Sequence, residues 1–251
     1  MEHARIHEIF SSIQGEGPWV GQRHIFVRFA GCDIRCRYCD TQTDSHLGTK
    51  EPDLQFCSVQ PVPGSNKREQ APSSLSSEML TQYCTRLMIP GPSRPVISLT
   101  GGEPLLQASF LADWLPTVRG TFRIYLETSG IHHDAMTDMR DLVDVVSIDF
   151  KLPSATGLRP FWEEHKKFLQ AAQGKALFIK VVVTKDTEKN DILTSAGIIA
   201  GFDLFTTLII QPAGGAHAPE SILLMDFQDA ALGILSDVRV IPQAHTMLNV
   251  P

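Results

Sequence analysis

Residues 177–183 read LFIKVVV and residues 207–211 read TLIIQ, two nearly continuous apolar runs of strand length. Both runs are rich in β-branched residues, and each is too short for a buried helix. Continuous apolar character is typical of strands that are covered on both faces, as in a parallel sheet. The two runs therefore predict the centre of a buried parallel sheet.

The same pattern extends along the chain in both directions. We expect further strands at residues 24–29, 96–100, 123–127, 145–150 and 238–242. Amphipathic segments separate them, and we expect helices at residues 77–88, 109–118, 161–172, 191–200 and 221–235. Alternation of strand and helix predicts βα units, and hence an α/β fold of parallel strands with outer helices. A full or partial βα barrel and an open doubly wound sheet both fit 251 residues.

Composition limits the class of protein. The chain is 43% hydrophobic and 20% charged, which is ordinary for a globular protein, and we expect a single domain over residues 1–251. The net charge of −6 argues against a nucleic-acid partner and favours a small-molecule substrate. No apolar stretch approaches the ~18 residues of a membrane span. The opening MEHARIHEIF lacks the apolar core of a signal peptide, so we expect a cytoplasmic protein.

One segment interrupts the alternation. Residues 44–75 are polar and rich in Pro, Ser and Gly. A structureless loop of this length is unusual inside a compact domain, and such loops are often functional or mobile. We expect a flexible insertion that either partly covers the active site or forms a neutral surface loop.

Three cysteines lie in the string GCDIRCRYCDTQ, at Cys32, Cys36 and Cys39. Three thiolates with this spacing can hold three irons of a [4Fe–4S] cluster, which leaves one iron open for chemistry. A zinc site with His24 or Asp40 as fourth ligand is the alternative. Disulfides are disfavoured because the number of cysteines in the set is odd and cytosolic thiols stay reduced.

Polar residues follow most of the predicted strands at their carboxyl ends, where parallel barrels and open sheets place their ligand sites. The most specific of these segments is TGGEP at 100–104, where two glycines allow the backbone to approach a ligand closely. A single polar group at a strand end usually belongs to a turn or a helix cap. Polar residues that recur at several strand ends beside a cysteine loop therefore predict a ligand site at the carboxyl edge of the sheet.

These motifs resemble those of the radical S-adenosylmethionine (SAM) superfamily: the three cysteines, Tyr38 before the third of them, and GGEP at 101–104. A closer resemblance covers nearly the whole chain. IQGEGPWVG at 13–21, ETSG at 127–130 and the ending VIPQAHTMLNVP are similar to the 7-carboxy-7-deazaguanine synthase family. The resemblance implies a partial βα barrel of the radical SAM type, modified by an insertion after the cluster loop.

The resemblance also implies roles for individual residues. Cys32, Cys36 and Cys39 would hold the [4Fe–4S] cluster, and Thr41 would bind Mg²⁺. The SAM pocket would be formed by Tyr38, Gly102, Glu103, Ser129, Ser147, Asp149, Lys151 and Gln211. The pterin substrate would contact Ile13, Gln14, Gly15, Glu16, Arg28, Thr100, His245 and the terminal carboxylate of Pro251.

The implied reaction is the ring contraction of 6-carboxy-5,6,7,8-tetrahydropterin to 7-carboxy-7-deazaguanine with loss of ammonia, on the route to the tRNA nucleoside queuosine. It would begin with hydrogen abstraction at C6 by a 5′-deoxyadenosyl radical. A homodimer and a reduced flavodoxin-type electron donor are further family expectations. Two alternatives remain: a glycyl-radical activating enzyme that acts on a protein partner, and a non-catalytic zinc- or cluster-binding module.

Overall fold

A computed structural model describes residues 3–39 and 54–250, and its strands form one mixed sheet. The strand order is β11-β10-β9-β8-β7-β6-β2-β1-β3-β4, and β5 pairs with β1. The strands are β1 (Ala4–Ile13), β2 (Arg23–Phe29), β3 (Phe56–Val59), β4 (Glu69–Pro72), β5 (Ser74–Leu75), β6 (Val96–Gly101), β7 (Arg123–Thr128), β8 (Val145–Phe150), β9 (Ala176–Val183), β10 (Leu208–Pro212) and β11 (Val238–Val240). All neighbours from β2 through β6 to β11 pair in parallel.

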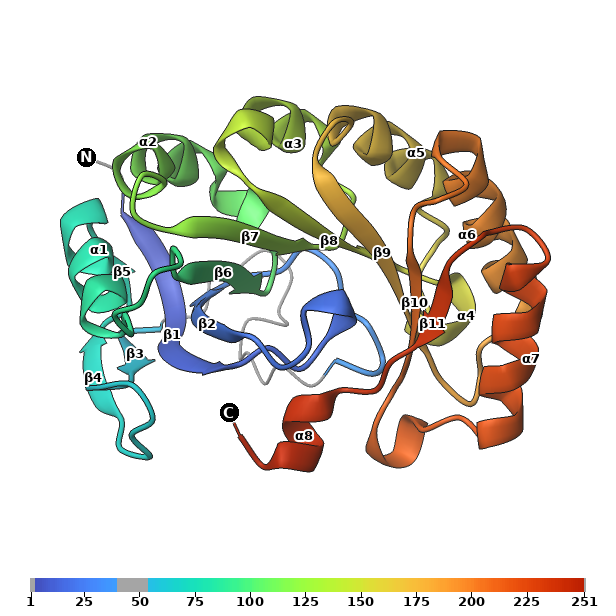
Figure 1. The fold of residues 1–251 in the computed structure, drawn as a ribbon, viewed down its shortest axis with the longest axis horizontal. Helices are drawn as coiled ribbons and strands as arrows, with labels where there is room; N and C mark the ends of the chain where they lie inside the picture. The colour runs from blue at the N-terminus through green and yellow to red at the C-terminus, as the bar shows by residue number, and fades with distance from the viewer. Residues whose placement is uncertain (1–2, 40–53, 251) are drawn as a thin grey trace.

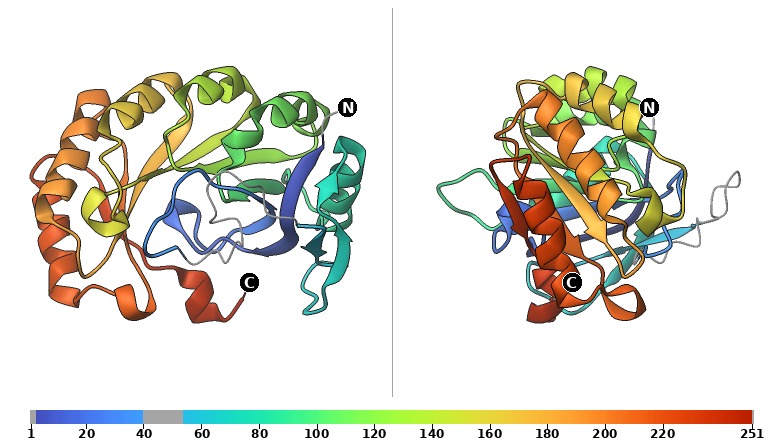
Figure 2. Two further views of the ribbon diagram at one scale, coloured as in Figure 1. Left: turned by 180° about the vertical axis from the view of Figure 1, so that it is seen from behind. Right: turned by 90° about the vertical axis from the view of Figure 1, so that its right-hand side faces the viewer.

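The sheet curves, and the helices α2, α3, α5, α6 and α7 lie on its outer, convex side, whereas α8 lies at the open side (Figures 1 and 2). The longer helices are α1 (Ser77–Arg86), α2 (Ala108–Val118), α3 (His133–Met139), α5 (Trp162–Ala171), α6 (Lys189–Phe202) and α7 (Ser221–Leu232); the short helices α4 (Pro153–Thr156) and α8 (Ala244–Leu248) follow β8 and β11. Within the described residues no strand pairing joins β11 to β4, so the sheet stays open. This arrangement is an α/β fold with the outline of a partial barrel.

The two faces of the parallel strands differ in chemistry. On β7 and β9 the side chains toward the helices, such as Ile124, Leu126, Ile179 and Val181, are completely buried in the main apolar core. Because side chains alternate along a strand, the residues between them point to the concave side. There β9 carries Lys180, which lines a cavity. The run LFIKVVV is thus covered by helices on one face only, and its other face supports a polar site.

The expected strands and helices are confirmed, with ends shifted by a few residues. The prediction of a structureless insertion is wrong for residues 54–75, which include the strands β3, β4 and β5. β1 needs a partner on its outer edge, and β3 pairs with it in parallel at Glu8 and Ile9. Cys57 and Val59 of β3 are buried in the core, which explains why this polar segment is ordered. Residues 44–53 of the expected insertion lie outside the described residues.

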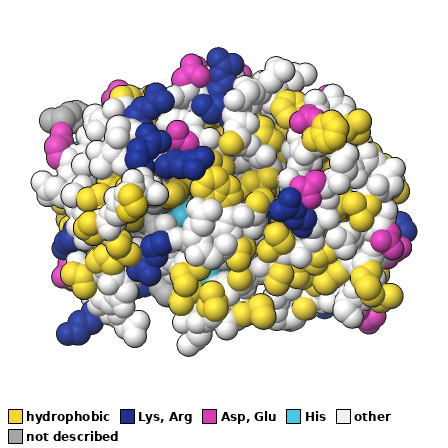
Figure 3. All heavy atoms as spheres, in the orientation of Figure 1, with side chains coloured by type: hydrophobic (Ala, Val, Ile, Leu, Met, Phe, Trp, Pro, Cys, Tyr) yellow, Lys and Arg dark blue, Asp and Glu magenta, His cyan; other side chains and the backbone are white. Residues whose placement is uncertain are grey.

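No helix in the described part of the chain is both long and apolar enough to span a membrane. Acidic and basic side chains both occur on the face of the molecule shown in Figure 3.

A histidine in the sheet interior makes fold stability depend on pH. His24 of β2 is buried, its Nδ1 lies 2.7 Å from the Ser98 hydroxyl, and its ring packs near Trp19 and Tyr125. Burial lowers the pKa of His24 from 6.5 to about 4, so the folded protein keeps this ring neutral. The neutral ring contributes fully to the stability of the fold above pH 6.5. This contribution is lost as the pH falls toward 4, because the unfolded chain binds a proton at His24 that the folded chain does not yet bind.

We therefore expect the free energy of unfolding to fall by about 2 kcal/mol because of His24 when the pH is lowered from about 7 to about 5. In His24→Phe, which keeps an aromatic ring there, this part of the pH dependence should disappear. Urea unfolding of both proteins at the two pH values measures the change in unfolding free energy with pH for each. The contribution of carboxylates that titrate in both proteins cancels when the two changes are compared. Equal pH dependence in the two proteins would contradict the neutral buried ring.

Candidate active site

A cavity of about 580 Å³ opens on the concave side of the sheet, at the carboxyl ends of the parallel strands. The six neighbouring parallel strands β2, β6, β7, β8, β9 and β10 each contribute at least one polar side chain to its wall: Arg28, Thr100, Glu127, Ser147, Asp149, Lys180 and Gln211. The cysteine loop after β2 and the segment Ile13–Glu16 after β1 also border it. The cavity therefore lies where the sequence predicted a ligand site.

The side chains of Cys32, Cys36 and Cys39 all line this cavity. Burial raises the pKa of Cys32 to about 11 and also raises that of Cys36, so loading a metal must release protons. Among the described residues, no three His, Cys, Asp or Glu side chains converge on one point as a single metal ion requires. Thiols that bind separate irons of a cluster do not need such a point.

The alternative zinc ligand His24 does not join the cysteines. Its side chain is enclosed by aromatic rings and Ser98, and it is not part of the cavity wall. The second alternative, Asp40, lies outside the described residues.

The GGEP turn is packed against the chain that leads into Cys32. The Gly102 amide donates to the Phe29 carbonyl at 3.1 Å, and the Glu103 amide donates to the Gly31 carbonyl at 2.8 Å. A Cβ on Gly102 would lie 1.8 Å from the Gly31 oxygen. Gly102 also lines the cavity, but the backbone contact with Gly31 is already enough to require a glycine at this position.

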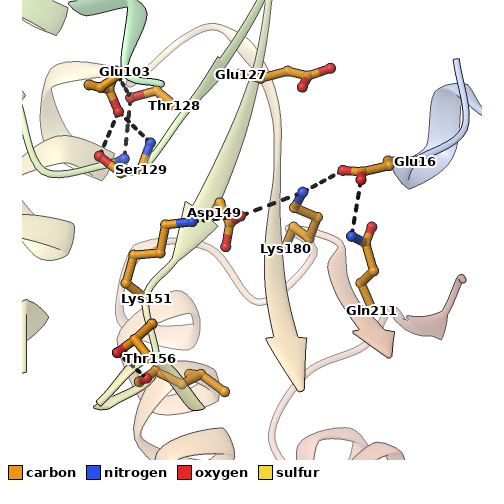
Figure 4. Close-up of polar contacts among 12 residues, drawn as sticks. Glu16, Glu103, Glu127, Thr128, Ser129, Asp149, Lys151, Thr156, Lys180 and Gln211 are labelled. Atoms are coloured by element: carbon orange, nitrogen blue, oxygen red, sulfur yellow. Dashed lines mark hydrogen bonds and ion pairs between the residues drawn. The ribbon is translucent and has the colours of Figure 1, made fainter. Parts of the chain in front are cut away.

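Glu103 lies behind the cavity wall, although a place in the ligand pocket was expected for it. It is buried and is not among the lining residues. Its carboxylate accepts hydrogen bonds from the Thr128 hydroxyl at 2.9 Å, and from the Ser129 amide at 2.8 Å and hydroxyl at 2.6 Å (Figure 4). Glu103 thus joins the turn after β6 to the turn after β7 and holds Ser129 at the cavity.

A row of alternating charges crosses the floor of the cavity (Figure 4). Lys151 Nζ lies 2.9 Å from Asp149 Oδ2, Lys180 Nζ lies 3.5 Å from the same oxygen, and Lys180 also forms an ion pair with Glu16. Burial alone would raise the pKa of Glu16, but the positive charge of Lys180 lowers it to about 2. Glu16 is therefore an anion at neutral pH.

Besides the Tyr38 hydroxyl, one carboxylate oxygen and one amide oxygen in this region are buried and lack a hydrogen-bond partner among the described residues. They are Asp149 Oδ1 and Gln211 Oε1, and both residues line the cavity. Buried polar atoms are seldom left unpaired, and both atoms are acceptors. They fit a ligand that brings hydroxyl or amine donors.

The two ends of the chain meet at the other side of the cavity. The Ala244 amide, at the start of α8, donates to the Gly15 carbonyl at 2.8 Å. A Cβ on Gly15 would lie 2.2 Å from His245 Nδ1, so glycine is needed for this contact. The expected substrate residues Ile13, Gln14, Gly15, Glu16, Arg28, Thr100 and His245 all line the cavity.

Some cavity residues were not assigned a role from the sequence. Gln243 Nε2 donates to Glu16 at 2.9 Å, and Glu127 accepts from Gln14 at 2.9 Å and Thr100 at 2.8 Å. A lysine inside LFIKVVV and a glutamate at a strand end were visible signals for Lys180 and Glu127, but alternation alone does not show their partners. Thr41 and Pro251 lie outside the described residues.

Arg28 has a protein partner in the structure. Its Nε lies 2.7 Å from Glu8 Oε1, and both side chains are about one quarter exposed at the cavity. A substrate carboxylate would therefore share Arg28 with Glu8 or displace it.

The Gly102 contact leads to a stability prediction. Gly102→Ala should lower the free energy of unfolding by about 2–3 kcal/mol or more, because the new methyl group meets backbone that cannot rotate away. Gly197→Ala, on the open surface of α6, is the matched control and should change stability by no more than about 1 kcal/mol, in the stabilising direction. Urea unfolding measures both. Equal stability of the two variants would contradict the tight contact with Gly31.

Comparison with known proteins gives consistent matches. The model of the radical SAM superfamily matches residues 26–184. The 7-carboxy-7-deazaguanine synthase of Geobacter sulfurreducens is 36% identical over 250 residues, which are 98% of this chain and 97% of that protein. The enzyme of the same name from Methanopyrus kandleri is 31% identical over 97% of this chain and 93% of its own length.

The fold also matches a solved structure, that of QueE from Escherichia coli. The TM-score is 0.61 at 21% identity, over 97% of this chain and 95% of the other. The cysteine loop and the GGEP turn lie within the matched superfamily region, at one end of the same cavity. The chain therefore belongs to the radical SAM superfamily and, within it, to the 7-carboxy-7-deazaguanine synthase family.

Proposed function

We propose that this protein is a lyase that converts 6-carboxy-5,6,7,8-tetrahydropterin to 7-carboxy-7-deazaguanine with loss of ammonia, on the route to queuosine. The observation that carries the proposal is one cavity bordered by three cysteine side chains and by the polar segment Gln14–Glu16. A cofactor and a small polar substrate can meet there, and the match to relatives named 7-carboxy-7-deazaguanine synthase favours this substrate over a protein.

Cys32, Cys36 and Cys39 would hold a [4Fe–4S] cluster with one iron left for SAM. Sulfur donors are the ligands that iron–sulfur clusters require, and the three cysteine side chains border the same cavity. When bound, the cluster and SAM would supply the 5′-deoxyadenosyl radical that removes a hydrogen atom from C6 of the pterin.

SAM would occupy the side of the cavity next to the cysteine loop. Asp149 Oδ1 and Gln211 Oε1 would accept hydrogen bonds from its hydroxyl or amine groups, which satisfies both buried atoms. The other expected SAM residues at the wall are Tyr38, Gly102, Ser129, Ser147 and Lys151. Glu103 would contribute indirectly by holding Ser129 in place.

The pterin would occupy the side where the chain ends meet. Ionised Glu16 can accept from the N–H groups of the amino-pyrimidinone edge, and Lys180, Gln211 and Gln243 hold its carboxylate in place. Arg28 would bind the substrate carboxylate, for which a guanidinium has matching donor geometry. These residues position the substrate ring beside the radical source and exclude water from it.

Further features belong to the proposal, most of them on the strength of family resemblance. Mg²⁺ would bind through Thr41, and the carboxylate of Pro251 would contact the substrate. A homodimer, a reduced flavodoxin-type electron donor and a cytoplasmic location complete it, with residues 1–251 acting as one domain.

A direct test is to reconstitute the protein anaerobically, reduce it, and add SAM with the carboxytetrahydropterin. We expect about four irons per chain and a product with the mass of 7-carboxy-7-deazaguanine. Cys36→Ala should lose at least about 100-fold in activity, because the cluster loses a ligand, while Cys84→Ala, far from the cavity, should retain both the iron and the activity. Bound zinc without iron, or SAM cleavage without the deazapurine product, would contradict the proposal.

The role of Glu16 gives a second prediction. Glu16→Gln should lower kcat/KM for the pterin by about tenfold or more, because an ionised acceptor is lost beside Lys180. Iron content should not change. Glu163→Gln, an exposed change on α5, is the control and should match the wild type. Initial-rate kinetics decide the matter, and unchanged kcat/KM would remove Glu16 from the substrate side.

A further inference from the structure

A buried histidine outside the cavity joins two of its loops. His165 lies on α5 and is completely buried. Its Nδ1 lies 3.0 Å from the Gly130 carbonyl oxygen, and its Nε2 lies 3.1 Å from the Lys151 amide nitrogen. The ring stacks on Phe150 with 4.2 Å between ring centroids. His165 does not line the cavity and so cannot contact a ligand there.

The two partners define the protonation state of the ring. A backbone amide can only donate, so Nε2 must accept from Lys151, and Nδ1 must carry the proton that it donates to Gly130. The neighbouring charges are Asp149, Lys151 and Glu164, yet burial outweighs them and lowers the pKa of His165 to about 4. The ring is therefore neutral at physiological pH, with one defined tautomer.

The two bridged loops carry residues of the cavity wall. Gly130 directly follows Ser129, and Lys151 pairs with Asp149 through its own side chain. Gly130 has a positive φ of 69°, and a Cβ there would lie 2.5 Å from Ile148 Cγ2 and 3.3 Å from His165 Nδ1. The turn after β7 therefore fits closely against the imidazole and the side of β8.

We propose that His165 is a positioning residue for the SAM side of the cavity. Its neutral imidazole bridges the Gly130 carbonyl and the Lys151 amide, and so sets the distance between the loops after β7 and β8. Ser129, Asp149 and Lys151 then reach the cavity in a fixed relative position. The proposal rests on the SAM site proposed above.

Three substitutions separate the hydrogen bonds from packing. His165→Gln can place an acceptor near the Nε2 position, His165→Asn can place a donor near the Nδ1 position, and His165→Phe keeps an aromatic ring with neither group. Each is compared with Glu163→Gln on the exposed side of the same helix. The measurements are the dissociation constant of SAM for the cluster-loaded protein, its iron content, and its thermal unfolding temperature.

We expect His165→Phe to bind SAM about tenfold or more weakly at unchanged iron content. His165→Gln should recover most of the loss, because the Lys151 amide keeps a partner, and His165→Asn should recover less. Wild-type affinity in a folded, loaded His165→Phe protein would overturn the proposal. Equal losses in His165→Phe and His165→Gln would also overturn it, because they would indicate packing alone. Failure of the wild type to bind SAM would instead contradict the proposed function.

Discussion

The ion pair between Lys180 and Glu16 is the contact on which the arrangement of the site depends. A charged side chain in a mostly buried position is costly unless an opposite charge and hydrogen bonds compensate it. Lys180 points from β9 into the concave side, where Glu16 and Asp149 neutralise it. The segment after β1 must therefore fold over the far end of the sheet, more than 160 residues away in sequence. Gln211 and Gln243 complete the shell around Glu16 and bring in the last strands and the tail.

Glycines set the second constraint, because they allow backbone segments to touch. Gly102 and Gly31 bring the turn after β6 against the start of the cysteine loop, and Gly15 brings the first loop against α8. The cavity is thus closed by backbone contacts at both ends and by the charge row on its floor. These contacts fix the cavity wall from several parts of the chain, which suits a site that must position a reactive radical.

Most of the sheet could be predicted because the parallel strands carry their signal locally. Runs such as VVSIDF and LFIKVVV are apolar, β-branched and separated by amphipathic helices, so the elements from β6 to β11 were visible in sequence. β1 and the strands of residues 54–75 were not predicted, because these segments form strands by pairing with each other and not because of their own composition. Glu103 was recognised as important, but its hydrogen bonds to Ser129 hold the wall together from behind.

The sequence by itself determined the chemistry: three thiols in one loop, two glycines after a strand, and a recurring polar residue at the strand ends. These motifs are defined by residue type and by short spacing along the chain, so they can be recognised in the sequence alone. Only the tertiary structure decided which groups act together. Lys180 lowers the pKa of Glu16 and keeps it ionised, His165 is a neutral bridge between two loops, and Arg28 is paired with Glu8. Each of these properties is set by burial and by a partner from a distant part of the chain, and a local sequence pattern contains neither.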